Sequence, residues 1–222
     1  MLAIPAKRSQ TTLVSFLTRT EIDALLSSPD RTTRAGRRDH AMLVVAVQTG
    51  LRVSELTRLT NADVALGTGG HLRCYGKGRK ERITPLTNQT IAVLRTWMAE
   101  RRGQLTDPLF PSRNGGPLSS DAVERRLTKY ATIAQNRCPS LRDKQLSPHI
   151  LRHTAAMTLL HAGVDTSVIA LWLGHEETRT TQIYLHADLA LKEKALARTT
   201  PPNTSPGRYQ APDALLAFLD NL

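Results

Sequence analysis

The sequence predicts a mainly α-helical fold with a small antiparallel β-sheet, of the α+β class. Most segments carry apolar residues at a helical period and are bounded by capping residues, proline or glycine. Two short segments, HLRCY at 71–75 and ERITPL at 81–86, have strand composition instead and flank the basic turn GKGRK, which is typical of a hairpin. A chain of 222 residues with 40% hydrophobic residues can bury a core as one main domain.

The first half of the chain is expected to begin with a weakly structured leader, residues 1–15. TEIDALLSS, which starts at Thr20, predicts a short amphipathic helix. After the basic loop RTTRAGRR, the mostly apolar segment 39–48 predicts a buried helix that Gly50 stops. Arg52 then precedes a second helical piece, VSELTRL.

Beyond the hairpin, the helical period returns from Thr87 to about Arg101. A loop follows, RNGGPLSS, which contains two adjacent glycines. Asp121 and Glu124 then predict a capping box for a helix that ends at about Gln135.

Ser147 and Pro148 predict another helix start, because a hydroxyl caps a helix well and proline suits its first position. That helix is expected to run to about His161. DTSVIALWL predicts a shorter helix that reaches Gly174.

The last part of the chain is expected to hold a segment through Tyr184 and a helix at 188–197. A Pro/Ser/Thr linker, TTPPNTSPG, and a terminal amphipathic segment, PDALLAFLDNL, come after it. The predicted organisation is therefore a leader at 1–15, a main domain at 16–198, and a linker with a C-terminal helix at 199–222.

Composition indicates the partner and the compartment. Lys and Arg number 30 against 19 Asp and Glu, a net charge of +11, which favours a polyanionic partner such as nucleic acid over a merely basic protein. The two cysteines lack CxxC spacing, which disfavours a disulfide framework or a zinc ribbon. With no signal sequence, and with AMLVVAV too short to span a bilayer, we expect a soluble cytoplasmic protein with no membrane association.

Three familiar motifs find little support in the sequence. GGHLRCYGKG has the wrong glycine spacing for a phosphate-binding P-loop, and Gly78 stands where Ser or Thr should bind magnesium. His149 and His153 have the spacing of HExxH zinc proteases, but Ile150 replaces the catalytic glutamate. The sequence contains no DxD-like cluster of the kind that would indicate a two-metal nuclease.

SPHILRH, residues 147–153, is a candidate anion site. His149 and Arg152 share one face of the first helical turn, where backbone N–H groups already favour an anion. Arg152 offers a fork of donors, and His149 can move a proton near neutral pH. The alternative is an ordinary polar helix end, and His153 is expected to be structural.

Four further residues are candidates, each with a plain structural alternative. Arg52 in TGLRVSEL stands at a helix start, with Glu55 placed to orient it. Lys77 lies in the GKGRK turn, His175 follows a helix stop, and Tyr184 lies nine residues after His175.

In this order, the residues resemble the catalytic domain of the tyrosine recombinase (phage integrase) family, in particular its Xer-like branch. The family pattern is Arg, Lys, His-x-x-Arg, His, Tyr. It is matched over about residues 17–197 by all six positions: Arg52, Lys77, His149, Arg152, His175 and Tyr184.

The resemblance implies site-specific DNA recombination, such as the integration, excision, inversion or resolution of a mobile element. Tyr184 would attack a DNA phosphate to give a 3′-phosphotyrosyl link, and Arg52 and Arg152 would hold the non-bridging oxygens. Lys77 would protonate the leaving 5′-oxygen, while His149 and His175 would assist. Neither a cofactor nor a metal is implied. The alternatives are a DNA-binding regulator with the same fold and a type IB topoisomerase.

The resemblance also implies double-stranded DNA as partner and a homo-tetramer on DNA, assembled through the segment 199–222. Packing of that segment on its own domain is the alternative. Relatives usually carry a separate N-terminal core-binding domain, whereas here the resemblance already begins near residue 17. A minimal recombinase, a fragment and a decayed copy are the three interpretations, and each predicts weak DNA binding by the chain alone.

Overall fold

A computed structural model describes residues 15–76 and 81–174, all of which lie in the first compact unit of the chain, Met1–Ala187. The expected leader, the tip of the hairpin turn, and every segment predicted after Gly174 lie outside the described residues. The domain boundaries therefore stay predictions.

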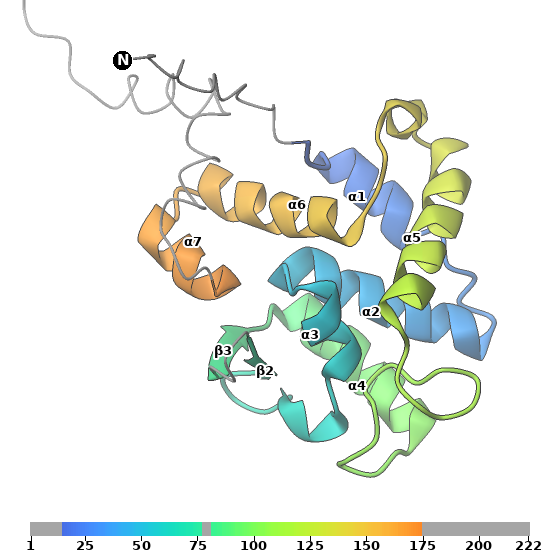
Figure 1. Cartoon of the computed structure of the whole chain (residues 1–222), viewed down its shortest axis with the longest axis vertical. Helices are drawn as coiled ribbons and strands as arrows, with labels where there is room; N and C mark the ends of the chain where they lie inside the picture. The colour runs from blue at the N-terminus through green and yellow to red at the C-terminus, as the bar shows by residue number, and fades with distance from the viewer. Residues whose placement is uncertain (1–14, 77–80, 175–222) are drawn as a thin grey trace, which may run out of the picture. The chain divides into compact units, whose positions relative to one another are not determined.

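The described part contains seven α-helices and a three-stranded antiparallel sheet, which confirms the predicted fold class (Figure 1). The helices are α1 (Arg19–Leu26), α2 (Arg34–Thr49), α3 (Val53–Arg58), α4 (Asn88–Arg101), α5 (Ser120–Gln135), α6 (Pro148–His161) and α7 (Thr166–Leu173). The strands are β1 (Val64–Ala65), β2 (His71–Tyr75) and β3 (Glu81–Pro85), and 3-10 turns lie at Asn61–Asp63 and Pro139–Asp143.

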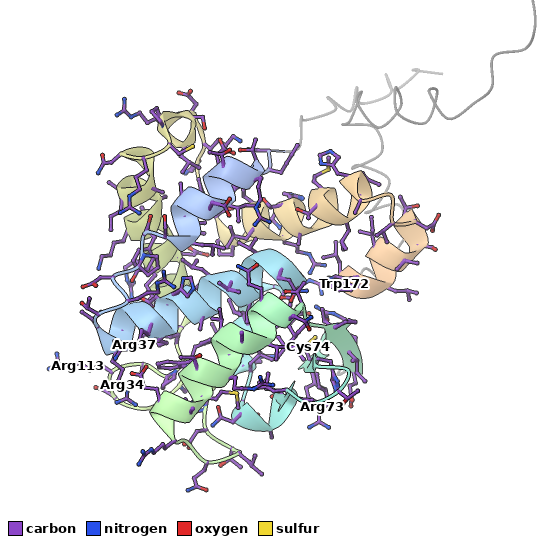
Figure 2. All side chains as sticks on the ribbon, turned by 180° about the vertical axis from the view of Figure 1, so that it is seen from behind. Arg34, Arg37, Arg73, Cys74, Arg113 and Trp172 are labelled. Carbon is purple, nitrogen blue, oxygen red and sulfur yellow. The ribbon has the colours of Figure 1, made fainter. Side chains whose placement is uncertain are left out.

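Helix α2 is the centre of the core. It packs against α4 on one side and α6 on another, as Figure 1 shows. Its apolar residues Met42, Leu43 and Val45 are almost completely buried, as the hydrophobic run in the sequence predicted. From behind, Figure 2 shows Arg37 at one end of this helix and Trp172, which comes from α7, at the other.

The hairpin pairs β2 with β3, so that Arg73 faces Ile83 and Cys74 faces Arg82 across the strands. Leu72 and Cys74 are buried against the helices, whereas Arg73 and Ile83 lie on the outward face. The two-residue strand β1 adds to the edge of β2 and was not predicted. The sheet lies next to α7, which contacts β3.

Three helix boundaries lie where glycine or proline in the sequence predicts them. Gly50, with φ of 64°, and Gly174, also with φ of 64°, adopt the left-handed conformation that ends α2 and α7. At the start of α6, Ser147 accepts a hydrogen bond from Ile150 N, and Pro148 is the first helical residue. All three predictions are confirmed.

Three predicted helix starts are wrong. Helix α1 begins at Arg19, capped by Thr18 in a capping box with Glu21, rather than at Thr20. Helix α2 already begins at Arg34, within the segment predicted to be a basic loop. Helix α5 is capped by Ser119, two residues before the predicted cap Asp121, because the Ser119 hydroxyl accepts a hydrogen bond from Ala122 N.

Candidate active site

Arg52 is placed by the end of α2. The left-handed Gly50 turns the chain so that Arg52 becomes the residue that caps α3. Glu55, one turn into α3, accepts a 2.8 Å hydrogen bond from the Arg52 backbone and a 3.0 Å bond from its Nη1. The Arg52 side chain is 40% exposed and that of Glu55 only 3%. The buried Glu55 carboxylate therefore anchors one side of a guanidinium that stays partly exposed to solvent. The expected orienting role of Glu55 is confirmed.

Arg152 is buried, which the sequence did not predict. The residue is only 4% exposed. Its Nη1 donates to the carbonyl of Gly50 at 2.8 Å, and its Nη2 donates to the carbonyl of Leu173 at 2.6 Å. Arg152 therefore joins the start of α6 to the ends of α2 and α7.

His149 and His153 stack edge to face, with ring centroids 4.2 Å apart. Burial, with the positive charges of Arg152 and Arg52, lowers the pKa of His149 below its ordinary value. Burial, with His149 and Arg152, lowers the pKa of His153 to about 4. Both rings are therefore favoured in the neutral form near pH 7, in which an imidazole nitrogen can accept a proton.

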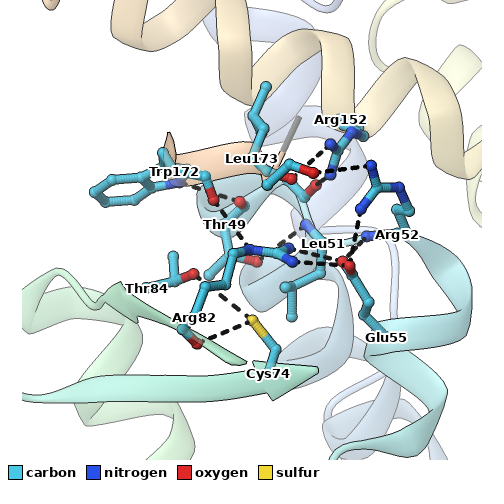
Figure 3. Close-up of polar contacts among 12 residues, drawn as sticks. Thr49, Leu51, Arg52, Glu55, Cys74, Arg82, Thr84, Arg152, Trp172 and Leu173 are labelled. Atoms are coloured by element: carbon cyan, nitrogen blue, oxygen red, sulfur yellow. Dashed lines mark hydrogen bonds and ion pairs between the residues drawn. The ribbon is translucent and has the colours of Figure 1, made fainter. Parts of the chain in front are cut away.

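Three arginines from different parts of the fold donate hydrogen bonds to the C-terminus of α7 (Figure 3). Three successive carbonyls accept one bond each: Trp172 O from Arg82 Nε at 3.2 Å, Leu173 O from Arg152 Nη2 at 2.6 Å, and Gly174 O from Arg52 Nη2 at 3.1 Å. The last carbonyls of a helix have no intrahelical donor and lie at its negative dipole end, so cations are favoured there.

Arg82, on β3, is the site residue that sequence reasoning missed. Its Nη1 and Nη2 donate to the two oxygens of Glu55 at 2.8 Å and 2.7 Å. Burial alone would raise the pKa of Glu55, but the bonds and charge of Arg82, together with Arg52, hold that pKa below its ordinary value. A signal was present: strand alternation puts Arg82 opposite the buried Cys74, and an arginine on an inward face requires a partner.

Of the six predicted site residues, the structure describes Arg52, His149 and Arg152. Arg52 and Arg152 converge on adjacent carbonyls of α7, and their charges act on His149. Lys77, His175 and Tyr184 lie outside the described residues. Lys77 belongs to the segment between the two hairpin strands, and His175 is the residue after Gly174.

Neither a metal cluster nor a membrane span is found among the described residues. They contain no group of three or more His, Cys, Asp or Glu arranged to hold a metal ion. Within the same residues, every helix is too short or too polar to cross a membrane.

Comparison with known proteins identifies the family. The sequence model of the phage integrase family matches residues 15–190. The chain belongs to the phage integrase family. Within it, the chain has a Xer-like tyrosine recombinase catalytic domain, as the relatives below support.

The putative integrase/recombinase y4rC of Sinorhizobium fredii is 57% identical over all 222 residues, which cover 67% of that protein. The tyrosine recombinase XerD of Pseudomonas putida is 38% identical over 194 residues, 85% of this chain and 63% of XerD. The chain thus spans about two thirds of the length of these relatives.

Solved structures agree with this family assignment. A XerA recombinase superposes with a TM-score of 0.71 at 26% identity, over 90% of this chain and 68% of that one. A XerH site-specific recombinase bound to its palindromic difH substrate, in a post-cleavage complex, gives 0.73 at 26% identity, over 86% of this chain and 55% of that one.

Proposed function

We propose that this chain is a DNA strand transferase that performs site-specific recombination. The Tyr184 oxygen attacks a scissile phosphate, forms a 3′-phosphotyrosyl bond and releases a 5′-hydroxyl. The 5′-hydroxyl of another strand then attacks the phosphotyrosine, which restores a phosphodiester and the free tyrosine. The number of phosphoester bonds stays constant, so the exchange requires no ATP.

One observation carries the proposal: arginines from α3 and α6 meet at the C-terminus of α7, one residue before His175. Arg52 is partly exposed there and is anchored by Glu55, so its guanidinium can donate hydrogen bonds to phosphate oxygens. Preorganised donors of this kind stabilise the charge that develops in a phosphoryl transition state. Membership of the phage integrase family supports the same chemistry.

The remaining roles are assigned by chemistry and family likeness. His149, favoured as a neutral ring, is suited to exchange a proton with the tyrosine or a phosphate oxygen. Arg152 supports the phosphate site from within the protein, Lys77 protonates the leaving 5′-oxygen, and His175 contacts the phosphate. Positioned acid catalysis of this type contributes about 10²- to 10⁴-fold.

Double-stranded DNA is the proposed substrate. The net charge of +11 suits a polyanion, and XerH, a structural relative, has been solved with its DNA substrate. We further propose a homo-tetramer assembled on DNA through residues 199–222. If residues 211–222 are deleted, assembly should be lost while the thermal stability of the monomer is retained. A loss of monomer stability would instead indicate packing on its own domain.

The decisive test is a nicked suicide duplex taken from DNA that flanks the coding sequence. The full chain should form a covalent protein–DNA adduct, resistant to boiling in detergent, with a free 5′-hydroxyl on the released strand. Tyr184→Phe should bind the same duplex with unchanged affinity and form no adduct.

Two other outcomes would replace the proposal. Specific binding without any adduct on a verified target would indicate a DNA-binding regulator. Relaxation of supercoiled plasmids without recombinant products would indicate a type IB topoisomerase.

A further inference from the structure

Arg82 occupies a position that the six-residue pattern does not include. Its side chain is 12% exposed and makes three hydrogen bonds, two to Glu55 and one to the carbonyl of Trp172. It stands on β3, the second residue after the segment that contains Lys77. One guanidinium therefore connects the hairpin, α3 and α7, which are the three elements that carry Lys77, Arg52 and the approach to His175.

We propose that Arg82 is the positioning residue of this active site: it sets Arg52 and the end of α7 relative to the hairpin. This inference rests on the proposed function and deepens it. Arg82 does not touch the reacting phosphate, because its donors are directed to Glu55 and to Trp172 inside the protein (Figure 3).

The shared carboxylate explains how Arg82 acts on Arg52. Glu55 accepts from both guanidiniums, and its charge of −1 is divided between two charges of +1. The cluster keeps a net positive charge, and Arg52, its more exposed member, can present that charge to a phosphate. Without Arg82, Glu55 would neutralise Arg52 fully and would be able to draw its guanidinium inward.

The contact with α7 explains the second effect. Arg82 Nε holds the carbonyl of Trp172, while Trp172 Nε1 donates to the carbonyl of Thr49 at 3.1 Å. These two bonds anchor the last turn of α7 to β3 and to the end of α2. A displacement of about 1 Å at a catalytic group can lower a rate about 10²-fold.

The test separates rate from affinity in the full chain. Arg82→Met should lower adduct formation at saturating suicide duplex about 100-fold and leave the Kd for that duplex within about threefold. Arg82→Lys keeps the charge but not the forked geometry, and should fall between the wild type and Arg82→Met. Arg73→Met is the matched control: it removes an arginine from the outward face of the same hairpin and should retain the wild-type rate at saturation.

Backbone amide exchange supplies a readout that does not require activity. In Arg82→Lys, the amides of Ala170–Gly174 and of α3 should exchange faster, with those of α4 and α5 unchanged. A wild-type rate at saturation in Arg82→Lys would overturn the proposal, as would a uniform rise in exchange over the whole protein. If the wild type forms no adduct, the proposed function fails. The positioning role is then tested by amide exchange alone. If the amides of α7 and α3 exchange as slowly in Arg82→Lys as in the wild type, the positioning role is wrong.

Discussion

At the scale of single residues, Glu55 is held by several partners at once. Its side chain is 3% exposed and accepts hydrogen bonds from the backbone of Arg52 and from the guanidiniums of Arg52 and Arg82. A carboxylate in this setting is stable only because its partners offset the cost of removing it from water.

Replacing Glu55 by Gln should therefore lower the free energy of unfolding by about 3 kcal/mol, because two buried or half-buried cations lose their shared partner. Urea denaturation at pH 7 measures the change. Asp23→Asn is the control, since Asp23 pairs with Arg19 in a well-exposed bridge, and such bridges contribute less than about 1 kcal/mol. Equal costs for the two substitutions would contradict this account of Glu55.

The lowered pKa of His153 predicts how the stability of the protein depends on pH. Its folded pKa of about 4 lies below the ordinary value of 6.5, so the unfolded chain binds the proton more readily. Stability is then complete above pH 6.5 and falls as the pH is lowered toward 4. By pH 4.5 the loss of stability should be about 2.5 kcal/mol, measured by thermal or urea unfolding at a series of pH values.

The variant His153→Gln should have a flatter profile over this window than the wild type. His149, whose pKa is also lowered, adds a slope of the same sign that remains in the variant. A wild-type profile that is level between pH 6.5 and 4.5 would show that His153 is not held neutral by the fold.

The sequence predicted part of this residue-level picture. Arg52, His149 and Arg152 could be selected because their spacing follows a motif, and Glu55 because it lies one helical turn from Arg52. The burial of Arg152 and the role of Arg82 could not be predicted in this way. Both depend on carbonyls of α7 that are distant in sequence, Leu173 for one and Trp172 for the other.

At the scale of elements, the end of α2 shows how closely α2, α6 and α7 meet. Gly50 has φ of 64°, and a Cβ there would lie 2.7 Å from Leu173 Cδ2 and 2.9 Å from Ala155 Cβ. The glycine is therefore required twice, for its left-handed backbone and for the space that a side chain would take.

Gly50→Ala should destabilise the protein by about 3 kcal/mol, because the strain of a left-handed residue and the clash with two helices add. Gly69→Ala isolates the first contribution, since Gly69 has φ of 70° and a Cβ added there would meet nothing within 4 Å. That control should cost about 1 kcal/mol in the same denaturation experiment. If the two variants lose the same amount, the close approach at Gly50 has no energetic weight.

Helix boundaries were predictable where one residue type determines them, as glycine does at the ends of α2 and α7 and proline does at the start of α6, whereas the starts of α1, α2 and α5 were not. Several hydroxyl or carboxylate residues compete near each start, as Ser119 and Asp121 do before α5. The early start of α2 has a local cause, because Thr33 caps the helix and its hydroxyl accepts a 3.0 Å hydrogen bond from Gly36 N. Gly36 itself lies so close to the Asp30 carbonyl that a Cβ there would clash with it.

At the scale of the whole molecule, the excess of positive charge should dominate the interaction with DNA. A net charge of +11 favours contacts to phosphates, and each contact releases condensed counterions. If the chain makes about six such contacts, its affinity for a duplex should fall about 10³-fold between about 50 and 200 mM salt.

Fluorescence anisotropy with a labelled duplex, over a series of salt concentrations, gives the slope. Tyr184→Phe should have the same slope as the wild type, because the tyrosine is uncharged at neutral pH. An affinity that is independent of salt, or in the low nanomolar range for random duplex at physiological salt, would contradict weak electrostatic binding by this chain.

The three successive carbonyls at the end of α7 have a consequence for insertions and deletions. An α-helix advances by about 1.5 Å and turns by about 100° for each residue. One residue added within Thr166–Leu173 would rotate Trp172, Leu173 and Gly174 away from their arginines all at once. The same insertion beside Gly115, in the loop between α4 and α5, would leave that phase untouched. The eight-residue length of α7 therefore sets the rotation at which the carbonyls of Trp172, Leu173 and Gly174 meet their arginines.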